Sequence, residues 1–115
     1  GGRSLDIRRL KGAEPPPNLR DDPKVMFLAA PFDAVFDVGP ATSGERFELE
    51  TGAGTSRISI VMSERKVPAS LRDRVPVVRV DGSPRWICGV RRIGAAAPGG
   101  AATYRLRIRG PTPWM

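Results

Sequence analysis

Basic side chains that stand beside apolar or proline-containing runs are the feature of this sequence with the most chemical promise. In chain order they are Arg46, Lys66, Arg72, Arg74 and Arg91. Rigid apolar anchors accompany them at Val67–Pro68, Val75–Pro76 and Trp86. Guanidinium and ammonium groups that a scaffold holds at fixed spacing are suited to binding phosphate. We therefore predict a phosphate-binding surface built from these five basic residues.

The sequence lacks several residue types and motifs on which common enzyme mechanisms depend. It contains no His, and Cys88 is its only Cys, so a Cys/His zinc site, an internal disulfide and Ser-His-Asp or Cys-His catalysis are excluded. Cys88 lies in the apolar run 85–90, which predicts a buried, unreactive thiol. Glu48 and Glu50 alternate as on any solvated strand face, and no phosphate-loop or metalloprotease motif occurs. We assign no catalytic residue, metal ligand or cofactor to this chain.

The charge of the chain indicates a polyanionic partner. The formal net charge is +7, the isoelectric point is near 11.0, and 16 of the 19 basic residues are Arg. This bias fits nucleic-acid recognition, although a GC-rich genome, which also enriches Ala, Gly and Pro, explains it as well. No stretch approaches the roughly 20 apolar residues of a membrane span. We therefore expect nucleic acid, and not a membrane, as the partner.

Short elements must position these residues. Residues 47–50 and 104–109 alternate between apolar and polar side chains, which predicts strands. Asp81–Gly82 predicts a tight hairpin between strands at 75–80 and 85–90. Thr55 or Ser56 as the N-cap and Pro68 as the stop predict a helix over about 56–66. The fold class predicted is α+β, with a mostly antiparallel β sheet or a partly open barrel and one short helix.

Three arginines alternate with apolar residues on the last predicted strand. Arg105, Arg107 and Arg109 would share the face opposite the buried one. They are either a second phosphate-binding strip or a solvated edge that discourages strand addition. From the sequence alone we favour the second interpretation, a solvated strand edge.

Composition divides the chain into three parts. Residues 1–24 combine a short edge strand with a Pro-rich extended segment and are predicted to link to a preceding domain. Residues 25–110 form the predicted domain, and residues 111–115 a tail. The start Gly1–Gly2–Arg3 lacks the apolar core of a signal peptide and an initiator Met. We expect a cytoplasmic protein, and a piece of a longer one.

The order of these motifs resembles the C-terminal domain of bacterial tRNA(Ile)-lysidine synthetase. In that family a Gly-Asp-Arg turn precedes a helix that ends in Lys-apolar-Pro, then come an Arg, a second apolar-Pro pair and a Trp-x-x-Gly-x-Arg strand. The matching residues here are Gly44–Glu45–Arg46, Lys66–Val67–Pro68, Arg72, Val75–Pro76, Trp86, Gly89 and Arg91. The resemblance covers about residues 35–93. Glu45 replaces the usual Asp, and a basic residue that the family often has before the turn is missing at 37–39.

The resemblance implies part of an enzyme. Members of the family use ATP to adenylate the wobble cytidine of tRNA(Ile) and replace the adenylate with lysine, in an N-terminal domain that this chain lacks. The C-terminal domain would position the tRNA, so tRNA and the chain's own catalytic domain are the implied partners. The alternatives are a structural module that docks or forms a homodimer with incidental charge, and a relative of the tRNA-sensing domains of phenylalanyl-tRNA synthetase.

Overall fold

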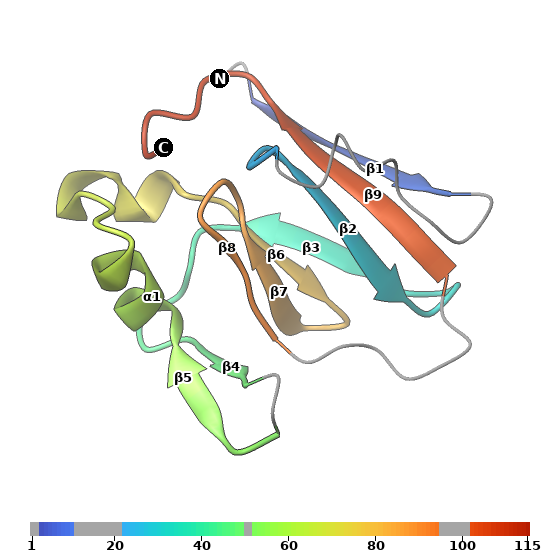
Figure 1. The fold of residues 1–115 in the computed structure, drawn as a ribbon, viewed down its shortest axis with the longest axis horizontal. Helices are drawn as coiled ribbons and strands as arrows, with labels where there is room; N and C mark the ends of the chain where they lie inside the picture. The colour runs from blue at the N-terminus through green and yellow to red at the C-terminus, as the bar shows by residue number, and fades with distance from the viewer. Residues whose placement is uncertain (1–2, 11–21, 50–51, 95–101) are drawn as a thin grey trace.

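The computed structural model describes residues 3–10, 22–49, 52–94 and 102–115, and these form short strands and helices in three antiparallel sheets (Figure 1). The strands are β1 (Ser4–Arg9), β2 (Val25–Ala30), β3 (Phe36–Gly39), β4 (Arg46–Glu48), β5 (Thr55–Arg57), β6 (Val77–Val80), β7 (Ser83–Ile87), β8 (Arg91–Arg92) and β9 (Ala102–Arg109). The α-helix α1 (Ile58–Glu64) and the 3₁₀ helix η2 (Ala69–Arg74) lie between β5 and β6. The strand orders are β1-β9-β2, β3-β6-β7-β8 and β4-β5.

The three-stranded sheet is organised around β9, the last strand. β9 pairs with β1 on one side and β2 on the other, with Leu106 opposite both Ile7 and Met26. The alternation predicted for residues 104–109 is present, since Tyr104, Leu106 and Ile108 are buried and the intervening arginines are more exposed. The alternation thus fixes which face of this sheet meets the core.

The four-stranded sheet contains the predicted hairpin. β6 and β7 pair through a turn at Asp81–Gly82, whose φ angles of 50° and 84° are both positive, as this turn type requires. The Asp81 carboxylate also accepts a hydrogen bond of 2.9 Å from the backbone N–H of Val35. This contact ties the hairpin to the segment that enters β3.

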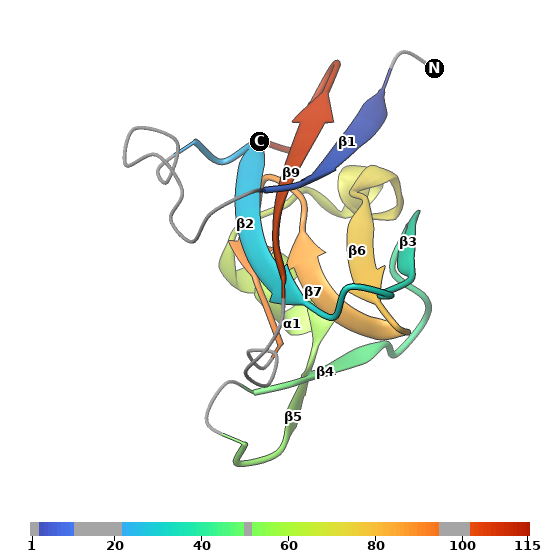
Figure 2. The same ribbon diagram turned by 90° about the vertical axis from the view of Figure 1, so that its right-hand side faces the viewer.

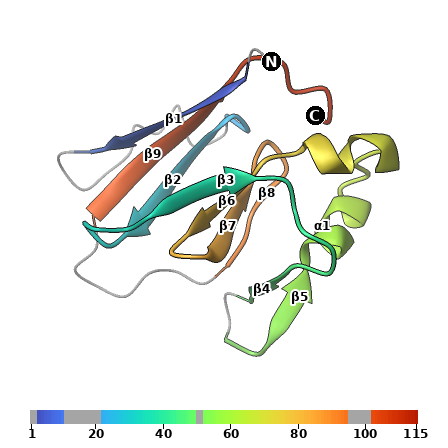
Figure 3. The same ribbon diagram turned by 180° about the vertical axis from the view of Figure 1, so that it is seen from behind.

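One buried cluster joins the two larger sheets and α1. It contains Leu28 and Leu106 from the three-stranded sheet, Val78 and Ile87 from the four-stranded sheet, and Met62 from α1. Phe47 of β4 belongs to the same cluster. The β4–β5 hairpin and α1 are at the opposite end of the domain from β1 and β9 (Figures 1 and 3).

The predicted fold class is confirmed, as a mostly antiparallel α+β domain whose described strands do not close into a barrel. The predicted helix was too long at its start. Thr55 and Ser56 belong to β5, and the N-cap of α1 is Arg57, which makes no side-chain capping bond. The first helical N–H, that of Ile58, instead donates to the carbonyl oxygen of Glu45 at 3.1 Å. A backbone carbonyl next to β4 therefore takes the place of the side-chain cap predicted at Thr55 or Ser56.

The structure describes residues 3–10 and 22–24 of the predicted N-terminal segment and the whole of the predicted tail, 111–115. β1 is an edge strand of the three-stranded sheet, as the alternation of residues 4–8 predicts. The Pro-rich part of the predicted linker, 11–21, and Glu50 lie outside the described residues. Within the described ranges, no helix is long and apolar enough to span a membrane.

Candidate nucleic-acid interface

The turn at residues 42–45 forms one wall of an open hollow of about 570 Å³, which we call the Glu45 hollow. The opposite walls come from β5, α1 and η2. Its lining residues are Ala41, Thr42, Ser43, Gly44, Glu45, Arg57, Ser59, Met62, Ala69, Arg72 and Asp73. Gly44 has a φ of +72°, a backbone conformation that other residues adopt at a cost, which explains a Gly at this point of the turn.

Arg79 holds the acidic residue of this turn in place. Its guanidinium donates two hydrogen bonds to the Glu45 carboxylate, at 2.7 and 2.6 Å, and one of 2.9 Å to the carbonyl oxygen of Pro40. The side chains of Arg79 and Glu45 are only 11% and 12% exposed. Asp37 adds an outer contact at 3.3 Å. Glu45 is therefore a structural clamp.

Electrostatics follow from this clamp. The hydrogen bonds from Arg79 lower the pKa of Glu45 below its ordinary value of 4.5, against a smaller opposing effect of burial. Glu45 in turn raises the pKa of Arg79. Because the Glu45 charge is neutralised by Arg79, the cations that line the hollow, Arg57 and Arg72, face little opposing charge apart from Asp73. The hollow suits an anion.

Arg72 and Arg57 reach the hollow from different elements. The Nε–H of Arg72 donates to the carbonyl oxygen of Val67 at 3.1 Å, which fixes its side chain across the end of α1. Arg57 lies directly opposite Arg46 in the β4–β5 register, and the Nε–H of Arg46 donates to the Thr55 hydroxyl at 2.9 Å. The sequence did not reveal Arg57, because the helix predicted over about 56–66 placed it in a helical turn, whereas it belongs to β5.

Lys66 occupies the position just after the end of α1. Its φ is 58°, in the left-handed region that Gly usually takes there. The N–H of Lys66 donates to the carbonyl oxygen of Ser63, and that of Val67 donates to Met62, which completes a Schellman cap. The exposed Lys66 side chain thus projects from a strained position.

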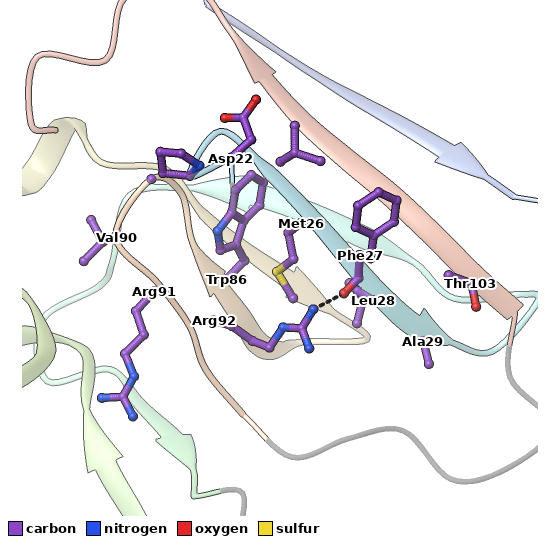
Figure 4. A pocket seen from close by; sticks show the side chains of 13 residues that line it. Asp22, Met26, Phe27, Leu28, Ala29, Trp86, Val90, Arg91, Arg92 and Thr103 are labelled. Atoms are coloured by element: carbon purple, nitrogen blue, oxygen red, sulfur yellow. Dashed lines mark hydrogen bonds between the residues drawn. The ribbon is translucent and has the colours of Figure 1, made fainter. Parts of the chain in front are cut away.

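Arg91 and Arg74 lie elsewhere. Arg91 lines a second open hollow, of about 610 Å³, between β2 and β8, which we call the Arg91 hollow (Figure 4). The neighbouring Arg92 crosses this space and donates to the carbonyl oxygen of Phe27. Arg74 is exposed on η2, and its carbonyl oxygen accepts a hydrogen bond of 3.2 Å from Arg3. The five predicted residues therefore do not form one continuous site.

Cys88 has the environment that the sequence predicts. Its side chain is completely buried, and burial raises the pKa of its thiol to about 12. A thiol with this pKa carries almost no thiolate at neutral pH, so it is unsuited to nucleophilic chemistry.

Comparisons with known proteins agree on one family. The family model described as "TilS substrate C-terminal domain" matches residues 36–108. The solved structure titled "Crystal structure of TILS C-terminal domain" is similar, with a TM-score of 0.63 and 19% identity, over 96% of this chain and 84% of that one. No curated protein matched. The family match spans more than half of the chain and includes the turn at Glu45, η2 and the Trp86 strand. This chain therefore belongs to the family of C-terminal domains of TilS, the tRNA(Ile)-lysidine synthetases.

Proposed function

We propose that this domain binds tRNA(Ile) and positions it for a separate catalytic domain, which joins lysine to the wobble cytidine with ATP. The observation that carries the proposal is the Glu45 hollow, which Arg57 and Arg72 line from different elements together with a carboxylate that Arg79 pairs. Guanidinium groups in such a setting are suited to phosphate oxygens. ATP and lysine would be handled by the catalytic domain, and the complex would act in the cytoplasm.

Phosphate contacts of this kind position an RNA without reading its sequence. We therefore assign the hollow to the tRNA backbone and leave discrimination between tRNAs to other contacts. Arg46 and Lys66 stand beside the hollow, on β4 and at the end of α1, and would extend the contact. Arg74 and Arg91 are weaker candidates, because they lie on other surfaces.

Binding of tRNA(Ile) to this chain should weaken steeply as salt rises, because each phosphate contact releases counterions. Replacement of Arg57 by Gln should weaken binding roughly tenfold, about 1.4 kcal/mol. It should also reduce the slope of log affinity against log salt by about 0.9. Fluorescence anisotropy at several salt concentrations measures both quantities.

The matched control is Arg9→Gln, which removes the same charge from an exposed residue of β1, a strand that lies away from the β4–β5 hairpin (Figure 1). Equal affinities for the two variants would argue against the Glu45 hollow. Affinity that is independent of salt, or no RNA binding at all, would contradict the proposal and favour a module that docks on protein.

Lys66 allows stability and binding to be separated. Its left-handed backbone costs about 1 kcal/mol for a residue with a Cβ. Lys66→Gly should therefore raise the free energy of unfolding by about that amount while it weakens RNA binding. Lys66→Gln keeps the strain and removes the charge, so it should weaken binding without the gain in stability. Urea unfolding and RNA titration test both variants, and wild-type affinity in both would remove Lys66 from the interface.

A further inference from the structure

Four arginines gather on the outer face of the β1-β9-β2 sheet. Arg105, Arg107 and Arg109 of β9 alternate with buried residues and so point away from the core. Arg8 of β1 lies directly opposite Arg105 in the register, which places it on the same face. We call Arg8, Arg105, Arg107 and Arg109 the arginine face.

Protection of a sheet edge does not explain the three arginines of β9. β9 is the central strand of its sheet and is paired on both sides. The backbone N–H and C=O groups of a central strand are already paired, so a foreign strand cannot add to it. Charges on such a strand are therefore not needed to prevent strand addition. The solvated-edge explanation that the sequence favoured for Arg105, Arg107 and Arg109 is therefore wrong.

The arrangement also costs stability. Like charges that lie directly opposite each other on paired strands repel, and Arg8 and Arg105 are such a pair. The acidic residue that shares the face, Asp6, makes an ion pair with Arg109 at 3.7 Å, with the two side chains 35% and 56% exposed. Among the described residues no other ion pair involves the arginine face. A polyanion would relieve this repulsion.

We propose that the arginine face is a second phosphate-binding surface, which contacts the sugar-phosphate backbone of the RNA that the domain binds. The proposal rests on the proposed function for the identity of the RNA. Its arginines recur at every second residue of β9, in steps of about 6.8 Å, so they present a row of donors to a repeating anion. The face belongs to β1 and β9, which lie on the other side of the domain from the β4–β5 hairpin and α1, and Arg57, Ser59 and Met62 of that hairpin and helix line the Glu45 hollow (Figures 1 and 2). The two surfaces would therefore hold different segments of one folded RNA.

Neighbouring arginines on β1 provide a matched test. Arg8 and Arg9 are both exposed, but Arg8 belongs to the arginine face, whereas Arg9 lies opposite Tyr104 on the other face and stacks over Phe32 at 5.2 Å. We expect Arg8→Gln with Arg105→Gln to weaken tRNA binding roughly tenfold and to lower the salt slope by nearly two. Arg9→Gln should leave both close to wild type, and Asp6→Asn should tighten binding.

The outcomes separate this inference from the function on which it rests. If wild type binds no RNA, the proposed function fails. If Arg57→Gln weakens binding while the Arg8 and Arg105 variant binds like wild type, the inference fails and the function stands. Unchanged RNA affinity with weaker association of the catalytic domain would assign the face to a protein and overturn the inference. An RNA duplex of unrelated sequence should show the same losses, because phosphates carry no sequence information.

Discussion

Replacement of Arg79 by Ala should lower the free energy of unfolding by about 3 kcal/mol, because it leaves the largely buried Glu45 carboxylate without its partner. Arg79 makes two short bonds to Glu45 and a third to the Pro40 carbonyl oxygen. The loss should therefore loosen the whole turn at 40–45. Urea unfolding followed by circular dichroism measures the change. The control is Asp37→Asn, which should cost less than about 1 kcal/mol because Asp37 is 65% exposed.

The pH dependence of stability provides a second test of the ion pair between Arg79 and Glu45. The pKa of Glu45 is lower in the folded protein than its ordinary value of 4.5. The clamp therefore contributes fully above pH 4.5, and its contribution is lost as the pH falls through the lower, folded-state pKa. Wild type should exceed Glu45→Gln in stability at neutral pH, and the difference should shrink on acidification below pH 4.5. A difference that stays constant with pH would contradict the clamp.

The clamp also bears on function. It fixes the wall of the Glu45 hollow and neutralises one of the two carboxylates, Glu45 and Asp73, that line it beside Arg57. Its partners are 34 residues apart in the chain, so no local pattern could have paired them. The acidic residue of the Gly44–Glu45–Arg46 turn thus has a structural explanation.

Local signals predicted the parts of the fold that depend on neighbouring residues. The alternation of Leu106 and Ile108 with arginines identified the faces of β9, and Asp81–Gly82 identified the β6–β7 hairpin. The order of strands within a sheet was not predictable, because it depends on pairings between distant segments. That order decided the role of Arg105 and its neighbours, since it placed β9 in the centre of its sheet.

The candidate site could be predicted only in part, because local signals identify some of its residues and strand pairing determines the others. Arg72 was found because it stands beside motifs of the family, and the structure places it in the Glu45 hollow. Arg57 was missed because a helix predicted from Thr55 or Ser56 placed it in the first helical turn. The β4–β5 pairing places it opposite Arg46 instead.

Trp114 is the clearest case of a residue whose role the sequence concealed. It belongs to the predicted tail 111–115, yet it is 5% exposed, and its indole N–H donates to the Cys88 carbonyl oxygen at 2.8 Å. Arg3 stacks over its ring at 5.0 Å. A Cβ at Gly89, whose φ is +73°, would lie 3.1 Å from the Trp114 indole nitrogen and 2.7 Å from the Met115 sulfur. The absence of a side chain at Gly89, just after β7, therefore leaves room for residues 114–115 to pack there.

Trp114→Ala should lower the free energy of unfolding by about 3 to 5 kcal/mol, the range for removal of a buried Trp. Trp114→Phe keeps most of the apolar contact and loses the hydrogen bond to Cys88, so it should cost only about 1 kcal/mol. The rate at which a thiol reagent labels Cys88 reports release of the tail directly, because this thiol is fully buried in the native protein. Labelling should be faster in Trp114→Ala than in Trp114→Phe at the same low urea concentration. Equal labelling rates and equal stabilities in the two variants would show that residues 111–115 do not stabilise β7, the strand that contains Trp86.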